Sequence, residues 1–575
     1  MRSFRFSPAL PRTPAFAIGD GLILLALISL LYAGVRLSIH APAVVTGPNI
    51  SLSFSALPWY ALLSTGRMFV AYLLSLIFTL AYGYIAARNS TAEKILMPLL
   101  DVLQSVPILS FLPVVLLSLT VILPESIADE LAAVVLIFTS QAWNMTYSFY
   151  QSITTIPTEL REASAVFRFN PWLKFKTVEV PFAALGLIWN SMMSWAGGWF
   201  FLMAAEIFTI GSRDFRLPGI GAYLQTAANS GDLRAVTAGV FVLILTIILL
   251  DQVIWRPVLS WAEKFKVEMV SGEELPDSWL LDILTRSWLI ARFNERVWKP
   301  LSEWIDGQIS RRWRSDTMVV FEEKQEGHAT LAVKIFGIVA AVIVLYGAYR
   351  TVLMLRHVAA PEWGSIGLGV LATFARVASS LAIALLWTVP AGVMIGTNRR
   401  LASVFQPIVQ VIASVPATAL FPVLLLALLR LPAGLNIAAI VLMLMGTQWY
   451  LLFNVIAGAM AIPQDLRYTT DLLRLSRWDR WRTLILPALF PYIVTGAITA
   501  SGGAWNASII AERTEFGGQT YSTSGIGALI AGATGVANYP LLLAGTLALI
   551  ITVVTINRLF WRWLYRVAEE RYRME

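Results

Sequence analysis

The chain has 575 residues, of which 57% are hydrophobic and only 14% are charged. A soluble domain usually carries about 25% charged residues, so this composition excludes a disordered chain and an ordinary soluble enzyme and indicates a membrane protein with many spans. Lys and Arg outnumber Asp and Glu by 43 to 35, a net charge of +8. We attribute this excess to basic residues beside membrane spans rather than to nucleic-acid binding. The chain has no Cys and three isolated His residues, so no disulfide or metal cluster is predicted.

Apolar stretches of about 20 residues predict two sets of six membrane spans. The first set covers 18–39, 66–87, 99–123, 127–152, 181–208 and 235–257. The second set covers 331–355, 370–395, 405–429, 434–461, 485–511 and 539–561. The predicted fold is therefore an all-α polytopic membrane protein with about 12 transmembrane helices. A cleaved signal peptide ending near Ala41-Pro42-Ala43 is an alternative for the first stretch, but its length and its counterpart in the second set favour a retained span.

Basic residues alternate between the predicted loops. Segment 157–180 holds Arg161, Arg168, Lys174 and Lys176, whereas segments 40–66 and 119–131 hold neither Lys nor Arg. The positive-inside rule then places both termini in the cytoplasm. We predict a multi-pass protein of a bacterial inner membrane, with lipid around its spans.

The two sets of spans are copies of one sequence. At an offset of 309 residues, Pro98 matches Pro407, and Ser105-Val106-Pro107 matches Ser414-Val415-Pro416. At an offset of 306, Pro181 matches Pro487 and Gly239 matches Gly545. Each copy has an even number of spans, so the copies are parallel repeats about a pseudo-two-fold axis along the membrane normal, and any substrate path is expected between them.

The predicted domains are a first copy at 1–257, a cytoplasmic linker at 258–330 and a second copy at 331–575. The linker is charged and rich in Trp. Its stretch 278–293 predicts an amphipathic helix, which lies either on the inner membrane surface or against the protein as a solvated linker helix.

The loops between the fourth and fifth spans, 157–181 and 463–487, carry the most information about function. Pro157 and Pro463 each suit a helix start, and an acidic residue follows in the first turn. A second short helix begins near Trp172 and Trp478. A stiff, charged helix fixed between two spans can transmit a rigid-body push into the membrane.

These loops resemble the cytoplasmic "EAA" loop of type I ABC importer permeases. Glu162-Ala163-Ser164 and Val180-Pro181 match that pattern, and so does Leu486-Pro487. Tyr468-Thr469-Thr470 replaces the EAA triplet in the second copy, and Arg168 and Arg474 replace the family's Gly. The resemblance implies coupling helices that bind two cytoplasmic ABC ATPase subunits. The implied contact residues are Glu159, Arg161, Glu162, Ala163, Phe167 and Trp172 in the first copy, and Asp465, Arg467, Tyr468, Thr469, Leu473 and Trp478 in the second.

The end of each copy is similar to the nitrate/sulfonate/taurine/bicarbonate branch of that family. The similar segments are 199–206 and 217–221, with their counterparts 505–512 and 524–527. The branch implies a periplasmic solute-binding protein as partner and a small anion as solute. The chain has no Gly-Lys dipeptide and hence no P-loop, so ATP and Mg²⁺ are expected only on the ATPase subunits. No cofactor is expected in this chain, which is not itself predicted to be an enzyme.

Polar and Trp side chains inside spans are candidates to line a substrate pathway, because such groups are costly against lipid. They are Gln141, Trp143, Asn144, Asn190, Ser194, Trp195 and Trp199, with Gln448, Trp449, Ser501, Trp505 and Asn506 in the second copy. Plain packing is the alternative for each Trp.

Four charged residues are candidates for a gate or a structural role. Glu206 and Glu512 could bind ligand, form a gate ion pair or hold a periplasmic loop, and the last is favoured. Arg67 and Arg376 could contact an anion or the binding protein, or snorkel to the outer interface.

The preferred function is thus the translocation subunit of an ABC importer. The alternative is a twelve-span secondary transporter, which also consists of parallel halves. It requires ion-coupling carboxylates deep in the spans, and few are found there.

Overall fold

The structure, a computed structural model, describes residues 18–42, 44–210, 213–262, 279–288, 292, 294–312, 331–428, 430–460, 462, 464–516 and 519–572. The first half contains α1 (Ile18–Ser38), η1 (Phe54–Ala56), α2 (Leu57–Arg88), α3 (Ser90–Ser105), α4 (Ile108–Ile122), α5 (Glu125–Thr154), α6 (Thr158–Val166), α7 (Pro171–Lys174), η2 (Phe175–Glu179), α8 (Val180–Glu206), β1 (Thr209–Ile210), β2 (Arg213–Asp214), α9 (Ile220–Asn229), α10 (Leu233–Leu250), η3 (Asp251–Trp255) and α11 (Arg256–Ala262). The linker contributes α12 (Trp279–Arg286), η5 (Asn294–Trp298) and α14 (Lys299–Arg312).

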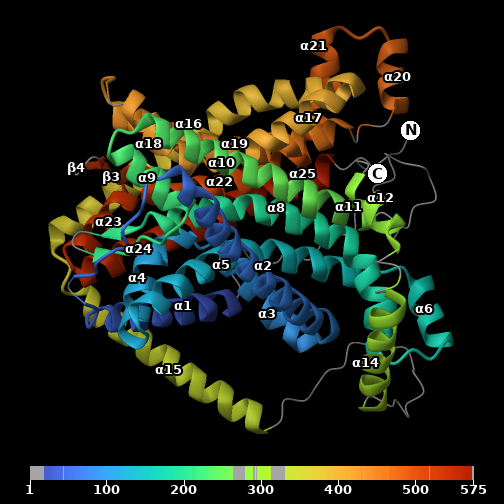
Figure 1. The fold of residues 1–575 in the computed structure, drawn as a ribbon, viewed down its shortest axis with the longest axis horizontal. Helices are drawn as coiled ribbons and strands as arrows, with labels where there is room; N and C mark the ends of the chain where they lie inside the picture. Colours follow the sequence, from blue (N-terminus) through green and yellow to red (C-terminus); the bar gives the residue numbers. More distant parts are fainter. Residues whose placement is uncertain are drawn as a thin grey trace, which may run out of the picture.

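The second half repeats this order. It contains α15 (Leu331–Leu355), α16 (Ala360–Thr397), α17 (Arg399–Ser414), α18 (Ala417–Leu428), α19 (Gly434–Met460), α20 (Gln464–Leu472), α21 (Arg477–Arg480), η6 (Trp481–Ile485), α22 (Leu486–Glu512), β3 (Arg513–Phe516), β4 (Gln519–Ser522), α23 (Ile526–Gly535), α24 (Tyr539–Ile556), η7 (Asn557–Trp561) and α25 (Arg562–Tyr572). In Figure 1, α6 and α20 project from one end of the bundle, here called the coupling end, and α9 and α23 lie at the opposite end.

The helices confirm a polytopic all-α fold. Among the described residues, eight helices are long and apolar enough to cross a membrane, and the pair α3 and α4 makes a ninth candidate. Helices α5 and α8 have 30 and 27 residues, which is long enough to span. They carry much of the polar content that was predicted to face a pathway, including Gln141, Asn144 and Asn190.

The predicted span 99–123 is not one straight helix. Helices α3 and α4 meet at a bend of 94°. The break lies at Val106, which is extended with φ −79° and ψ 125° and precedes Pro107. Proline disfavours helical backbone in the residue before it and has no N–H to donate, so the helix stops there. Val415 before Pro416 shows the same conformation between α17 and α18.

Local irregularities recur in both halves at the same relative positions. The π-helical turns η2 and η6 are 306 residues apart, and so are η3 and η7. A two-stranded antiparallel hairpin follows the fifth span in each half: β1 pairs with β2, and β3 pairs with β4. The duplication therefore extends from the sequence to details of the backbone.

The fifth spans contact the opposite half. Helix α8 packs against α17 and α18, and α22 packs against α4. The backbone N–H of Leu109 in α4 donates to Oδ1 of Asn506 in α22 at 3.3 Å, and Thr418 Oγ1 in α18 donates to the carbonyl of Phe200 in α8 at 3.4 Å. The two halves thus share one core, to which Trp199 and Trp505 both belong.

The first spans break the two-fold relation. Helix α1 packs against α3, α4 and α24, whereas α15, as far as its residues are described, packs chiefly against α1 and α24 rather than against α17, α18 and α10. Ser29 Oγ donates to the carbonyl of Val344, and Arg350 Nε donates to Tyr32 Oη at 3.2 Å. In consequence Phe241 in α10 is 65% exposed, whereas its counterpart Leu547 in α24 is 6% exposed.

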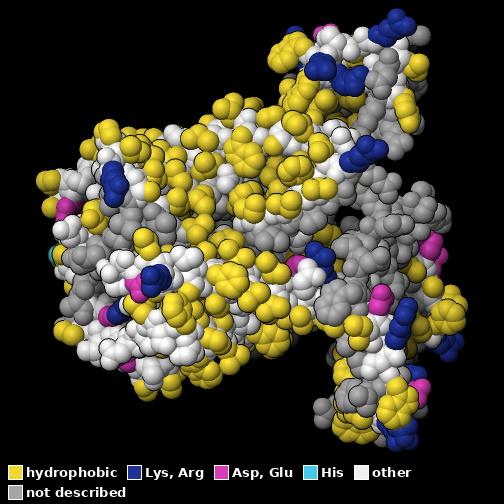
Figure 2. Space-filling model, turned by 45° about the horizontal axis from the view of Figure 1, so that its top comes forward, with side chains coloured by type: hydrophobic (Ala, Val, Ile, Leu, Met, Phe, Trp, Pro, Cys, Tyr) yellow, Lys and Arg dark blue, Asp and Glu magenta, His cyan; other side chains and the backbone are white. Residues whose placement is uncertain are grey.

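The outer surface of the bundle is apolar. Figure 2 shows hydrophobic side chains over its flank and Lys and Arg side chains on both projections of the coupling end. Exposed apolar residues along a helix bundle are the expected surface toward lipid tails. The long apolar helices together with this surface make the chain a multi-pass membrane protein.

Candidate functional site

Both predicted coupling loops form two short helices joined by a turn. In the first loop, the α6 residues Glu159, Arg161, Glu162 and Ala163 are exposed, as is Phe167 just after the helix, whereas Ser164 is buried. In the second loop, Tyr468, Thr469, Leu473 and Trp478 are exposed. The side chains of Asp465 and Arg467 lie outside what the structure describes. The resemblance implied that twelve residues of these loops contact the ATPase subunits. Those with described side chains are exposed, except for Trp172, which is partly buried.

The turn in each loop explains the missing family glycine. Arg168 has φ 51° and Arg474 has φ 50°, which is the left-handed region that glycine adopts most easily. The N–H of Phe169 donates to the carbonyl of Ser164, and the N–H of Arg168 donates to that of Ala165, so α6 ends in a Schellman motif. The arginines thus keep the glycine's backbone conformation in spite of their Cβ atoms.

Replacing Arg168 with Gly is expected to stabilise the first loop by about 1 kcal/mol, because a left-handed conformation costs an L-residue roughly 1–2 kcal/mol. Hydrogen exchange of residues 157–170 should slow by about fivefold, since 1.4 kcal/mol corresponds to a factor of ten. Arg474→Gly is the matched change in the second loop. Faster exchange in either variant would show that the arginine side chain contributes more than the backbone conformation costs.

The first loop is anchored at two points. At the base of the loop, the Arg88 guanidinium at the end of α2 forms an ion pair with Glu179, which is 3% exposed. On the linker side, Trp172 Nε1 donates to Asp306 Oδ1 at 2.8 Å, and Lys176 Nζ donates to Asp306 Oδ2 at 2.6 Å. Lys176 Nζ also donates to Ser302 Oγ at 2.7 Å. The linker helix α14 therefore lies against the second short helix of this loop.

The second loop differs from the first at both anchor points. The counterparts of Arg88 and Glu179 are Thr397 and Ile485, so the buried ion pair has no equivalent. Trp478, the counterpart of Trp172, is 73% exposed. Among the described residues, only the first loop is held by a linker helix.

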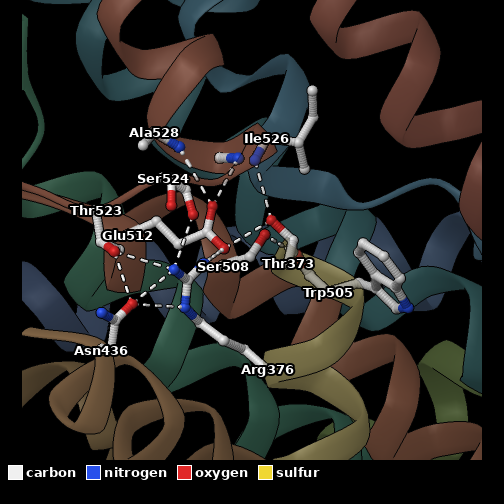
Figure 3. Close-up of polar contacts among 11 residues, drawn as sticks. Thr373, Arg376, Asn436, Trp505, Ser508, Glu512, Thr523, Ser524, Ile526 and Ala528 are labelled. Atoms are coloured by element: carbon white, nitrogen blue, oxygen red, sulfur yellow. Dashed lines mark hydrogen bonds and ion pairs between the residues drawn. The ribbon is translucent and has the colours of Figure 1, made fainter. Parts of the chain in front are cut away.

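A buried charge cluster lies near the opposite end of each half. In the second half, Glu512 at the end of α22 is fully buried, and its Oε1 accepts from Arg376 Nη1 and Thr373 Oγ1, both at 2.7 Å (Figure 3). Its Oε2 accepts from the backbone N–H groups of Gly527 and Ala528 at the start of α23. The carboxylate therefore pairs with a cation and also caps a helix N-terminus, where negative charge is favourable.

The first half has the same cluster with one added charge. Glu206 is fully buried and accepts from Arg67 Nη1 at 2.9 Å, from Ser64 Oγ at 2.7 Å and from the N–H of Gly221 at 2.7 Å. Arg67 also forms an ion pair with Glu130, whose side chain is 46% exposed. The counterpart of Glu130 is Asn436, whose Oδ1 accepts from Arg376 Nη2 at 2.7 Å. Arg67 thus has two carboxylate partners, and Arg376 has one.

Arg67 and Arg376 do not snorkel to solvent. They are 5% and 7% exposed, and their guanidinium groups donate to carboxylates and to backbone carbonyls of the loop before α9 or α23. This arrangement favours the structural alternative that was preferred for Glu206 and Glu512, because each cluster ties the second span, the fifth span and the following loop together.

Substituting Gly525 with Ala is expected to destabilise the protein by about 1–3 kcal/mol, the usual cost of overpacking. A Cβ there would lie 2.1 Å from Glu512 Oε2, and the carboxylate has no room to move because several donors hold it. Gly219→Ala should behave alike, with Glu206 Oε1 at 2.2 Å. The control is Gly364→Ala in α16, where no atom lies within 4 Å of the new Cβ. Reversible unfolding in mixed micelles measures all three, and equal stabilities would contradict the packing.

Most of the described contacts of the pathway candidates lie within one half. Trp195 packs edge-on against Tyr72 and Trp255, and Trp143 packs against Phe78, all within the first half. Asn190 Nδ2 donates to Ser148 Oγ, and Gln448 accepts from Trp387 Nε1, again within one half. Asn506 is the candidate whose hydrogen bond crosses to the other half. A pathway lining by these twelve residues stays a prediction.

Gln141 and Ser194 are buried, and their side-chain polar atoms have no hydrogen-bond partner within the described protein. The other candidates differ in exposure. Asn144 is exposed, Trp449 is partly buried, and Ser501 is buried together with Trp199 and Trp505.

Several functional contacts were not predicted from the sequence. Ser64, Glu130 and Asp306 are the main examples, and each reaches a partner between 63 and 142 residues away. A signal existed for Glu130, because it occupies the same repeat position as the polar Asn436, near the start of the fourth span. No local pattern points to Asp306.

The two parallel halves have matching spans, matching exposed loops at one end and matching buried charge clusters near the other end. This arrangement defines a duplicated membrane permease. The chain belongs to the family of binding-protein-dependent transport system inner membrane components. That family's model matches it twice, over residues 79–254 and 388–574, which confirms the fused arrangement recognised from the coupling loops.

Similar curated proteins are nitrate and bicarbonate permeases of cyanobacteria. The nitrate import permease protein of Synechocystis sp. is 30% identical over 147 residues, which cover 26% of this chain and 52% of that protein. The bicarbonate transport system permease protein of Synechococcus elongatus is 32% identical over 142 residues, covering 25% of this chain and 50% of that protein. The nitrate import permease protein of Leptolyngbya laminosa is 33% identical over 141 residues, covering 24% and 49%. The chain thus spans about half the length of the curated relatives that it matches.

Proposed function

We propose that this chain forms the whole translocation pore of an ATP-driven importer of a small anion. Two ATPase subunits bind the two coupling loops and supply the energy with their ATP and Mg²⁺. A solute-binding protein delivers the anion at the opposite end of the bundle. The membrane is a bacterial inner membrane with both termini in the cytoplasm, in line with the basic loops at the coupling end.

The observation that carries this proposal is the pair of coupling loops. Both project from the same end of the bundle (Figure 1), and each continues through a π-helical turn into the fifth span of its half. Because α8 and α22 both contact the opposite half, a push on either loop is delivered to the surface between the halves. Motion of rigid helices about such an interface is a known route of conformational switching.

The choice of a small anion rests on the relatives, whose names specify nitrate and bicarbonate. The clusters at Arg67 and Arg376 do not add to it, because carboxylates and carbonyl oxygens already occupy these guanidinium groups. The same contacts weigh against the secondary transporter. Its coupling carboxylates must exchange protons or ions, whereas Glu206 and Glu512 are each paired with an Arg.

Co-purification from the native membrane tests the proposal. The tagged full-length chain should bring an ABC ATPase subunit with it, in a ratio of two ATPase subunits to one chain. Proteoliposomes of this complex with its binding protein should take up nitrate or bicarbonate only with ATP inside. Uptake that persists without the ATPase subunit and follows a proton gradient would overturn the proposal in favour of the secondary transporter.

A further inference from the structure

The two coupling loops differ most in what holds them to the rest of the chain. Trp172 and Lys176 of the first loop donate hydrogen bonds to Asp306, and Lys176 donates another to Ser302, both on one face of α14. Positions 302 and 306 are one helical turn apart, so α14 presents a matched pair of acceptors to the loop. Three hydrogen bonds, two of them from a cation to the linker, fix the second short helix at this point.

The base of the same loop is fixed as well. The Arg88–Glu179 pair joins the end of the second span to the start of the fifth, and Glu179 is almost fully buried. Because α2 and α8 also pack together, the loop, both spans and α14 are connected into one body. In the second loop Thr397 and Ile485 exclude such a pair, and Trp478 projects with 73% of its surface exposed.

We infer that α14 is a permanent brace for the first coupling loop, so that the chain offers its ATPase partners two unequal surfaces. This inference rests on the proposed function, because the ATPase subunits are the partners that it assumes. At the first loop, an ATPase subunit meets the outward residues of α6 on a fixed support, while Trp172 is turned toward α14. At the second loop, the partner meets a less restrained helix and an exposed Trp478 that can enter an apolar groove. The first loop is rigid before the partner binds and transmits motion as a rigid body. The second loop becomes rigid only when the partner binds.

The Asp306 carboxylate stays charged at physiological pH. Burial raises the pKa of Asp306, but the hydrogen bonds from Lys176 and Trp172 outweigh it and hold the pKa below its usual 3.8. The carboxylate is therefore ionised at neutral pH and lost as an acceptor only in strong acid. A pH change near neutrality does not release the brace.

Charge reversal tests the contact without any ATPase subunit. Lys176→Asp or Asp306→Lys should each speed hydrogen exchange in residues 171–179 by about threefold, the loss expected for a partly exposed ion pair. The double variant K176D/D306K should restore part of the lost protection, because the ion pair forms again with its charges exchanged, whereas Trp172 Nε1 has no acceptor at position 306. Arg482→Asp, the matched change in the second loop, should leave exchange of residues 477–485 unchanged. Unchanged exchange in the first loop, or equal changes in both loops, would overturn the brace.

Function of the complex tests whether the brace positions the loop during turnover. With co-purified ATPase subunits in nanodiscs, the single reversals should lower kcat for ATP hydrolysis and leave KM for ATP unchanged, and the double variant should restore part of kcat. Rates are expressed per mole of assembled complex, so that a fall in protein yield does not lower kcat. Equal changes in kcat and KM would count against a positioning role.

A reversible cross-link decides whether the contact is permanent. The chain has no Cys, so Lys176→Cys with Asp306→Cys can be joined selectively by a short methanethiosulfonate cross-linker. A brace predicts that the linked sample hydrolyses ATP at least as fast as the unlinked one, which has lost the contact between Lys176 and Asp306. Inhibition by the link with recovery on reduction would overturn the brace and show that α14 must leave. If no ATPase subunit binds the chain, the proposed function fails, and the exchange experiment still judges the contact.

Discussion

Replacing Glu512 with Ala is expected to destabilise the protein by about 3–5 kcal/mol, because one partner of a buried ion pair is left without a counter-charge. The Arg376 guanidinium would keep only neutral acceptors, among them Asn436 and Thr523. The start of α23 would also lose the carboxylate that caps it. Reversible unfolding in mixed micelles measures the difference.

The matched change in the first half should cost less. After Glu206→Ala, Arg67 still has Glu130 as a partner at 2.6 Å, so the loss is expected at about 1–3 kcal/mol, typical of lost hydrogen bonds to a charged group. The difference between the two variants should vanish when Glu130→Ala is added to Glu206→Ala. A larger loss for Glu206→Ala than for Glu512→Ala would contradict the role given to Glu130.

Replacing Trp478 with Ala is expected to weaken binding of the ATPase subunits by at least about 30-fold. This corresponds to about 2 kcal/mol, the level that an interface hot-spot Trp commonly reaches. The physical reason is its exposed indole, which has 73% of its surface free to be buried by a partner. Affinity can be measured by interferometry with the chain held in nanodiscs.

Trp172→Ala is the matched control and should weaken that binding by less than about fivefold, because its indole already faces α14 and donates to Asp306. The decisive result is which of the two variants, Trp478→Ala or Trp172→Ala, loses more affinity for the ATPase subunits. Equal losses, or a greater loss for Trp172→Ala, would show that the ATPase subunits bind both loops in the same manner.

Local pattern was sufficient for most of the fold. Apolar length predicted the spans, the register of Pro, Gly and Trp predicted the duplication, and Pro157 and Pro463 marked the coupling helices. The 94° bend at Pro107 follows from the same chemistry, but a hydropathy pattern does not reveal it because both sides of the bend are apolar. Short helices α9 and α23 were missed, since each has only 10 residues and follows a hairpin.

The candidate site was harder because its contacts join distant parts of the chain. Arg67 was identified, but its partners Glu206 and Glu130 are 139 and 63 residues away. Spacing along one helix cannot show which of several acidic residues lies opposite it. The contact between Lys176 and Asp306 joins residues 130 positions apart, with both of the first half's last two spans and part of the linker between them. Such pairings depend on tertiary packing, so the periodicity of the sequence could not predict them.

The position of the first spans has a consequence for how this protein can evolve. Helices α1 and α15 lie against each other on one flank of the bundle. Two identical subunits related by a closed two-fold axis cannot form this arrangement, because the symmetry would place one such helix on each flank. Joining the halves removes that constraint. A substitution in a homodimer is always made twice, whereas here each position can change alone. The fused chain can therefore change one half without changing the other. Two pairs of equivalent positions already differ in this way, namely Glu130 and Asn436, and Glu179 and Ile485.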